Sequence, residues 1–109
     1  VLQGKTGHFT RAKGFDTFCP LGPFIQTEFT NNPELNIKAF VNGELKQDGN
    51  SRDMIYSIGE ILEFVTSIMT LLPGDVVMTG TPEGVSQVKP GDEIKIEIET
   101  LGTLINSVE

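Results

Sequence analysis

Alternation of apolar and charged residues is clearest near the end of the chain. Within residues 93–100, Ile94, Ile96 and Ile98 alternate with Glu93, Lys95, Glu97 and Glu99. Successive side chains of a strand point to opposite faces, so this pattern predicts a strand with one buried and one solvated face. A Leu-Gly turn follows, and residues 103–108 are predicted to return alongside as the last strand.

A β-hairpin is predicted in the middle of the chain. Ile37, Ala39 and Val41 alternate with Lys38, Phe40 and Asn42, which predicts a strand over residues 37–41 with one face more buried than the other. Residues 44–47 can form the partner strand. Asn42-Gly43 joins them and suits a type I′ turn, which needs positive φ at both central residues. Residues 24–29 are rich in β-forming side chains and predict another strand, which the Asn-Asn-Pro at 31–33 ends.

One long helix is predicted over residues 57–69. Ser57 can cap its first turn, and Glu60 follows at the capping-box spacing, in which each side chain accepts the other's backbone N–H. Apolar residues then recur every three or four positions, so they share one face that we expect to pack on a sheet. These residues are Ile58, Ile61, Leu62, Val65, Ile68 and Met69. Beyond the helix, Pro73-Gly74 turns the chain into residues 75–79, which are predicted to form a short buried strand.

Composition bounds the size and class of the protein. The 109 residues are 38% hydrophobic and 21% charged, which suffices for one core, and the excess of strands predicts an α+β fold that is mostly β. The net charge is −7 and the 8 basic residues are scattered, which excludes the basic surface that nucleic-acid binding needs. No apolar run is long enough to span a bilayer and no signal peptide opens the chain, so the expected location is the cytoplasm.

The beginning of the chain and its single cysteine add four expectations. Residues 1–12 are polar and aperiodic and predict a loop, and the start on Val1 without an initiator methionine predicts a segment of a longer polypeptide. Cys19 has no partner for a disulfide within the chain, and its place between Phe and Pro predicts a small buried hydrophobe rather than a nucleophile. His8 lies far from it in sequence, so a Cys/His catalytic pair is disfavoured.

Residues 13–23, Lys-Gly-Phe-Asp-Thr-Phe-Cys-Pro-Leu-Gly-Pro, offer a first candidate site. Prolines fix φ and remove donors, so the segment is predicted to be stiff and mostly buried and to hold Lys13 in one place. Lys13 is then either a surface residue, with its stem on apolar neighbours and its ammonium in water, or a placed positive charge that meets an anionic ligand. The pattern of residues leaves both readings open.

Residues 80–85, Gly-Thr-Pro-Glu-Gly-Val, offer a second candidate site. Glycines let a backbone approach a ligand closely, and a threonine hydroxyl with neighbouring N–H groups can donate to a carboxylate or phosphate. The same residues also mark a tight connection between strands, whether or not anything binds there. Glu97 and Glu99 share a strand face and could pair on a metal, although the surrounding isoleucines and Lys95 favour a plain half-exposed strand.

Seven segments, in order along nearly the whole chain, carry a resemblance to a known family. They are residues 10–23 and 41–48, Asp53-Met54-Ile55, Pro73-Gly74-Asp75-Val76-Val77, Thr79-Gly80-Thr81-Pro82-Glu83-Gly84-Val85, Pro90-Gly91-Asp92 and Leu101-Gly102-Thr103-Leu104. Together they resemble the fumarylacetoacetate hydrolase family, and within it the branch of 2-hydroxyhepta-2,4-diene-1,7-dioate isomerases and acylpyruvate hydrolases.

The resemblance implies a rolled, mixed β-sheet with one main helix, in which residues 1–109 are the C-terminal part of one catalytic domain of a homodimer. It implies a hydrolase, isomerase or decarboxylase that acts on 2,4-dioxo or 2-hydroxydienoic acids, such as acylpyruvates or intermediates of aromatic catabolism. In the family a divalent ion, Mg²⁺ or else Mn²⁺ or Ca²⁺, is held by carboxylates and stabilises an enolate. Those ligands are expected upstream of Val1; Glu97 and Glu99 do not match them, and this chain alone is expected to be inactive.

Four positions take roles from the resemblance. Gln3 matches a glutamine near the polar end of the substrate, and Lys13 matches the lysine beside the metal, where an ammonium stabilises developing negative charge. Thr81 matches the threonine that holds the substrate carboxylate, and Gly80 lets the backbone join it. The alternative, from another class, is a non-catalytic β module that binds a small anion or a partner chain through Lys13 and residues 80–84.

Overall fold

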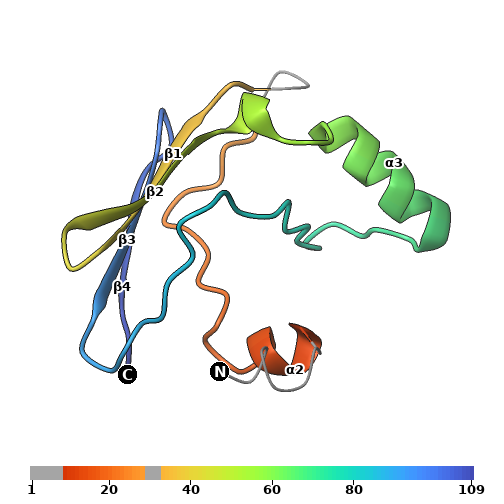
Figure 1. The fold of residues 1–109 in the computed structure, drawn as a ribbon. Helices are drawn as coiled ribbons and strands as arrows, with labels where there is room; N and C mark the ends of the chain where they lie inside the picture. Colours follow the sequence, from red (N-terminus) through yellow and green to blue (C-terminus); the bar gives the residue numbers. More distant parts are fainter. Residues whose placement is uncertain (1–8, 29–32) are drawn as a thin grey trace.

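An antiparallel sheet organises the part of the chain that the computed structural model describes, residues 9–28 and 33–109 (Figure 1). The strands are β1 (Asn36–Val41), β2 (Glu44–Asn50), β3 (Glu93–Ile98) and β4 (Gly102–Ser107), in the order β2-β1-β3-β4. The mostly β class with one main helix is confirmed. All three strand pairings are antiparallel. The described residues therefore contain none of the parallel pairs that the mixed sheet implied by the resemblance would include.

The Asn42-Gly43 turn forms as predicted and also ties the hairpin to β3. Both residues have positive φ, 51° and 78°, as a type I′ turn requires. The Asn42 side chain donates from Nδ2 to Asp92 Oδ1 at 2.8 Å and accepts at Oδ1 from the Glu93 backbone N–H at 2.9 Å. These bonds join the tip of the β1–β2 hairpin to the start of β3, 50 residues further along the chain.

Asn42→Gly is expected to raise the pKa of Asp92 towards its ordinary value. Hydrogen bonds from the Asn42 side chain and from the Lys89 backbone favour the ionised carboxylate and hold this pKa low. The bonds therefore add stability at neutral pH, and that stability is lost as pH falls through the lowered pKa. Glycine keeps the positive φ of the turn and removes only the side chain, and NMR titration of the complete protein measures the change.

Glu60 supplies the control for this titration. Its pKa is lowered by the side-chain and backbone hydrogen bonds of Ser57, which do not involve Asn42. We expect it to titrate identically in both proteins. An unchanged Asp92 titration in the variant would show that the Asn42 contact has no effect on the carboxylate in solution.

The two faces of the sheet differ in polarity, as the alternation predicts. On one face, Ile37, Ala39 and Val41 of β1 lie opposite Ile98, Ile96 and Ile94 of β3. On the other face, a polar row crosses all four strands. In that row Asp48 pairs with Lys38, Lys38 with Glu97, and Glu97 with Thr103 in the strand register. The apolar face is therefore the one on which further chain can pack.

The long helix α3 (Ile58–Ile68) begins and ends within one residue of its predicted bounds. Ser57 Oγ accepts from the Glu60 N–H at 3.2 Å, and Glu60 Oε2 accepts from the Ser57 N–H at 2.7 Å, which completes the predicted capping box. A single 3-10 turn (Ser51–Asp53) leads from β2 towards it. The loop predicted for residues 1–12 is wrong in its last part, because a short helix α2 (Phe9–Lys13) forms there.

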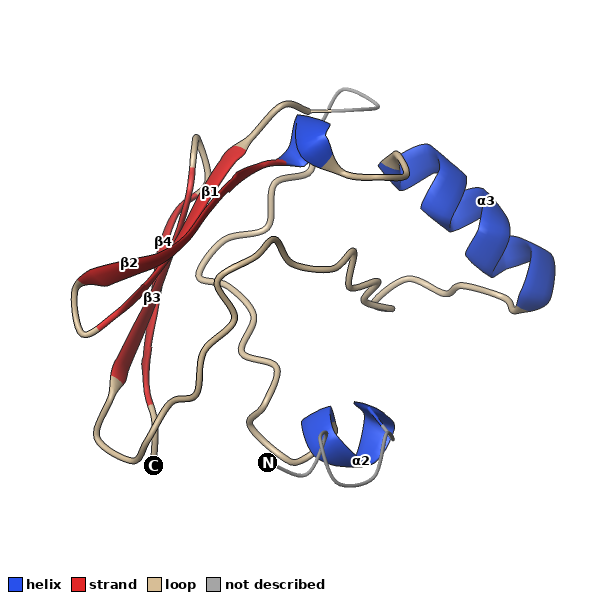
Figure 2. Cartoon of the chain, viewed as in Figure 1, coloured by secondary structure: helices blue, strands red, loops and turns tan. Residues whose placement is uncertain are grey.

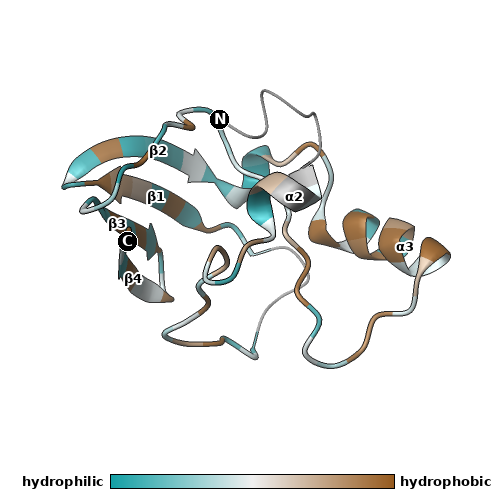
Figure 3. Cartoon of the chain, turned by 90° about the horizontal axis from the view of Figure 1, so that it is seen from below, coloured by the Kyte–Doolittle hydropathy of each residue, from teal (hydrophilic) through white to brown (hydrophobic). Residues whose placement is uncertain are grey.

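The predicted packing of α3 on the sheet is wrong for the described residues. The helix projects away from the sheet (Figures 1 and 2), and the extensive contacts are those between neighbouring strands. Figure 3 shows apolar residues along α3, of which Phe64 and Ile68 are 67% and 63% exposed. Among the described residues no side chain is fully buried, so the apolar faces of α3 and of the sheet remain open to further polypeptide.

Two predicted strands are wrong. Residues 24–28 and 75–79 are irregular, and the described sheet places no strand beside either of them to complete a ladder of hydrogen bonds. Residues 75–79 are not buried either, since Met78 is 76% exposed. Cys19 is likewise exposed rather than buried. The described helices include none with the length and apolar character that a membrane crossing requires.

Candidate functional site

Residues 80–84 form a loop that lies against the edge strand β2, and Gln47 makes the contact. Gln47 Nε2 donates to Thr81 Oγ1 at 2.9 Å, to the Pro82 carbonyl at 2.9 Å and to the Glu83 carbonyl at 3.2 Å. The Thr81 hydroxyl also lies 3.1 Å from Gln47 Oε1, to which it can donate. One side chain of the sheet thus holds three consecutive residues of the predicted site.

A β-bulge directs Gln47 towards this loop. Phe40 pairs with Leu45, whereas the next residue of β1, Ala39, pairs with Gln47, so Lys46 is the extra residue of β2. Without the bulge Lys46 would stand opposite Ala39. Because of the bulge, the Gln47 amide and not the Lys46 ammonium stands at the position that meets the loop. Bulges often redirect a side chain in this way.

Gly84 allows the loop to approach the bulge closely. Its φ is +95°, and a Cβ at this position would overlap the carbonyl oxygen of Lys46. Pro82, in the middle of the loop, approaches the same strand, since a Cβ at Gly49 would lie 3.1 Å from Pro82 Cγ. The Pro82 ring and the Gly84 backbone therefore both lie close against β2.

The predicted site residues lie in three places. Thr81 and Gly80 lie together in the loop, where Gly80 has a φ of +102° and open space around its α-carbon. Lys13 is the last residue of α2, on the same side of the sheet as the connection from α3 to β3 (Figure 1). Gln3 lies outside the described residues.

The segment that follows Lys13 differs from the prediction in its burial. Residues 13–23 are exposed rather than mostly buried, because the described chain places no other element over them. Phe15 and Phe18 pack on each other with ring centroids 5.5 Å apart, within the range typical of aromatic pairs. The position of Lys13 therefore does not depend on burial of the residues that follow.

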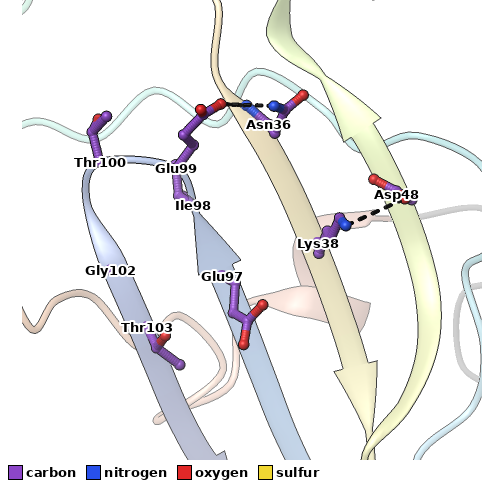
Figure 4. A pocket seen from close by; sticks show the side chains of 9 residues that line it. All are labelled: Asn36, Lys38, Asp48, Glu97, Ile98, Glu99, Thr100, Gly102 and Thr103. Atoms are coloured by element: carbon purple, nitrogen blue, oxygen red, sulfur yellow. Dashed lines mark hydrogen bonds and ion pairs between the residues drawn. The ribbon is translucent and has the colours of Figure 1, made fainter.

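An open polar pocket of about 860 Å³ lies on the opposite, polar face of the sheet (Figure 4). Its charged groups have protein partners. Lys38 Nζ lies 3.8 Å from Asp48 Oδ2, Lys95 Nζ donates to Glu97 Oε1 at 2.8 Å, and Asn36 Nδ2 donates to Glu99 Oε2 at 2.7 Å. The Lys38–Asp48 and Asn36–Glu99 pairs link neighbouring segments of the sheet, whereas Lys95 and Glu97 lie on the same strand, and we assign the pocket no ligand.

A metal-binding group of three or more His, Cys, Asp or Glu side chains does not occur among residues 9–28 and 33–109. The described residues therefore do not fit a divalent ion by themselves. The described residues offer a hydroxyl held by Gln47 and positive-φ glycines in one loop, and separately a lysine at the end of α2.

Gln47 is the site residue that sequence reasoning missed. It was assigned only to the end of a hairpin strand, since one glutamine between Lys46 and Asp48 carries no signature of its own. The bulge that turns it towards the loop depends on strand pairing, which the residue pattern does not specify at single-residue precision. The only available signal was an uncharged amide in an otherwise charged stretch of the strand.

The fold combines an antiparallel sheet with a loop in which Gln47 holds the Thr81 hydroxyl. Residues 2–109 match the family model described as Fumarylacetoacetate (FAA) hydrolase C-terminal. The chain belongs to this family, which confirms the resemblance seen in its motifs.

Two relatives illustrate the range of the family. The chain is 53% identical over 108 residues to an uncharacterized protein of Methanocaldococcus jannaschii, covering 99% of this chain and 45% of that protein. It is 44% identical over 100 residues to the 4-hydroxyphenylacetate degradation bifunctional isomerase/decarboxylase of Salmonella dublin, covering 90% of this chain and 23% of that one. The chain thus spans less than half the length of these relatives.

Two solved structures are similar in fold as well as in sequence. The 2-hydroxyhepta-2,4-diene-1,7-dioate isomerase of Mycobacterium marinum superposes with a TM-score of 0.92 at 47% identity, over 98% of this chain and 42% of that one. The maleylpyruvate hydrolase of Sphingobium sp. SYK-6 was solved in complex with manganese(II) and pyruvate. It superposes with a TM-score of 0.81 at 43% identity, over 86% of this chain and 36% of that one.

Proposed function

We propose that this chain is the substrate-binding C-terminal part of a metal-dependent enzyme that hydrolyses, isomerises or decarboxylates 2,4-dioxo or 2-hydroxydienoic acids. Membership of the family supports the class of enzyme. The named relatives include an isomerase, a hydrolase and a bifunctional isomerase/decarboxylase, which supports this range of reactions. The three reactions share an enolate and differ in which group gives or takes the proton.

The main structural support is the loop held by Gln47. A substrate carboxylate needs donors that stay in place, and Thr81 lies in a loop that Gln47 and the close approach of Gly84 hold on β2. The similar maleylpyruvate hydrolase was solved with pyruvate, a small oxo acid, and with manganese. We propose that Thr81 and the Gly80 backbone bind the carboxylate of such an oxo acid here.

Lys13 has a separate role in this proposal. Its ammonium would stabilise the negative charge that develops on the enolate oxygen, an effect that is largest where the group is fixed before the reaction begins. Gln3 would bind the polar end of the substrate. A bound divalent cation would supply Lewis acidity, with ligands from residues other than those described. Mg²⁺ as the metal, a homodimeric state and a cytoplasmic location remain predictions.

Removal of the metal tests the proposed function. The intact mass of the natural protein is measured first, and its turnover of acylpyruvates and oxaloacetate is then followed with EDTA and after addition of Mg²⁺. We expect EDTA to abolish turnover and excess Mg²⁺ to restore it, because the residues that bind substrate supply only part of the transition-state stabilisation.

The alternative is a non-catalytic β module that binds a small anion or a partner chain. A natural protein that begins at Val1 and shows no metal-dependent turnover would support this alternative and overturn the proposed enzyme. Turnover that is unaffected by EDTA would overturn metal dependence alone.

A further inference from the structure

We propose that Gln47 is a positioning residue that orients the Thr81 hydroxyl to donate its hydrogen to an anionic ligand. The inference rests on the proposed function, since it concerns the same loop. Gln47 itself lies in β2, is partly exposed and reaches the loop only through its side-chain amide.

The orientation of the amide is set by the backbone of the loop. Two carbonyl oxygens, of Pro82 and Glu83, lie 2.9 and 3.2 Å from Nε2. Carbonyls can only accept, so the NH₂ group and not the amide oxygen must face them. The same nitrogen lies 2.9 Å from Thr81 Oγ1, so one of its two hydrogens can be donated to the hydroxyl while the two carbonyls share the other.

This arrangement fixes what Thr81 can offer. A hydroxyl that accepts from an amide N–H still has its own hydrogen to donate, and accepting one bond strengthens the bond it donates. Without a ligand the hydrogen can point to Gln47 Oε1, at 3.1 Å. When a carboxylate occupies the site, the hydroxyl can turn its hydrogen to the anion and keep the bond from Nε2. Gln47 thus prepares Thr81 to bind negative charge.

Two substitutions of Gln47 separate its chemistry from its volume. Gln47→Met has similar length and removes every polar contact with the loop. Gln47→Glu has nearly the same shape, but a carboxylate only accepts, so it repels the Pro82 and Glu83 carbonyls and attracts the Thr81 hydrogen to itself. In the complete enzyme with acetylpyruvate as substrate, we expect Gln47→Met to raise KM about tenfold and Gln47→Glu to raise it further.

A double-mutant cycle tests whether Gln47 acts through Thr81. We expect Thr81→Ala to weaken binding, and Gln47→Met to add much less in the Thr81→Ala background than in the natural enzyme. Additive effects on KM, or a KM unchanged in both Gln47 variants, would overturn the proposal. A merely structural role would lower thermal stability without this coupling in KM.

Hydrogen exchange, which does not depend on turnover, tests this inference separately from the proposed function. Hydrogen exchange of residues 79–85 is compared between the natural protein, Gln47→Met and the control Asp48→Asn, which changes the opposite face of the same strand. We expect faster exchange in Gln47→Met only. If no substrate is turned over but exchange responds in this way, the proposed function fails and the positioning of the loop stands. If exchange is unchanged, Gln47 does not position the loop.

Discussion

Gly84→Ala is expected to displace the loop of residues 80–84 from β2 and to cause the largest loss of stability and of substrate binding. The φ of +95° is strained for alanine, and the added Cβ would meet the Lys46 carbonyl oxygen, which belongs to the backbone and cannot rotate aside. The loop must then move away from the sheet and lose the Gln47 bonds to Thr81, Pro82 and Glu83. We expect a loss of about 3 kcal/mol or more in the free energy of unfolding.

Gly91→Ala is the matched control for this substitution. Gly91 has a φ of +92°, almost that of Gly84, but a Cβ there would meet nothing within 4 Å. Gly91→Ala should lower the free energy of unfolding by about 1 to 2 kcal/mol, because of the backbone conformation alone, and should leave KM unchanged. Denaturant unfolding and steady-state kinetics of the complete protein measure both. An equal loss of unfolding free energy in the two variants would mean that the contact with the Lys46 carbonyl does not affect stability.

Lys13→Ala is expected to lower kcat about 100-fold with a smaller change in KM. A preorganised cation that meets developing negative charge stabilises the transition state more than the ground state, and losing one such group typically costs this much. Steady-state kinetics on acetylpyruvate with saturating Mg²⁺ gives both parameters. Lys13→Arg should recover part of the rate, because the charge is kept while the shape of the cation changes.

Lys38→Ala provides the control for charge. It removes the same positive charge from the polar face of the sheet, where Lys38 lies 3.8 Å from Asp48 and is 44% exposed. A solvated pair of this kind contributes little, so kcat should stay within about twofold of its natural value. If Lys13→Ala and Lys38→Ala lower kcat equally, the effect is one of net charge. An unchanged kcat in Lys13→Ala would remove Lys13 from the reaction.

Local signals in the sequence predicted the elements whose causes are local. The Asn42-Gly43 turn, the Ser57 capping box and the alternating isoleucines of β3 each depend on residues within a few positions of one another, and all three form as expected. The two segments for which the predicted strand is wrong, residues 24–28 and 75–79, have the composition of strands. A strand needs a neighbour, and a short apolar run does not show whether a neighbour exists.

The loop of the candidate site was predictable from the sequence, and the way in which the sheet holds it was not. The Gly-Thr-Pro-Glu-Gly sequence marked a loop where ligands can bind, and the resemblance assigned the roles of Lys13 and Thr81, which remain predictions. The support for the loop comes from Gln47, 34 residues earlier in the chain, through a one-residue bulge. Such a contact requires the strand register to be known first.

The docking of this loop also bears on the edge of the sheet. In the described sheet β2 is an edge strand, and an edge presents unpaired backbone groups to which a strand of another molecule can add. The bulge at Lys46 interrupts the regular spacing of those groups, and Gly84 lies against the Lys46 carbonyl. Alternate charged residues, Glu44, Lys46 and Asp48, add further protection. The contact that holds the loop therefore also shields an edge on which aggregation could otherwise begin.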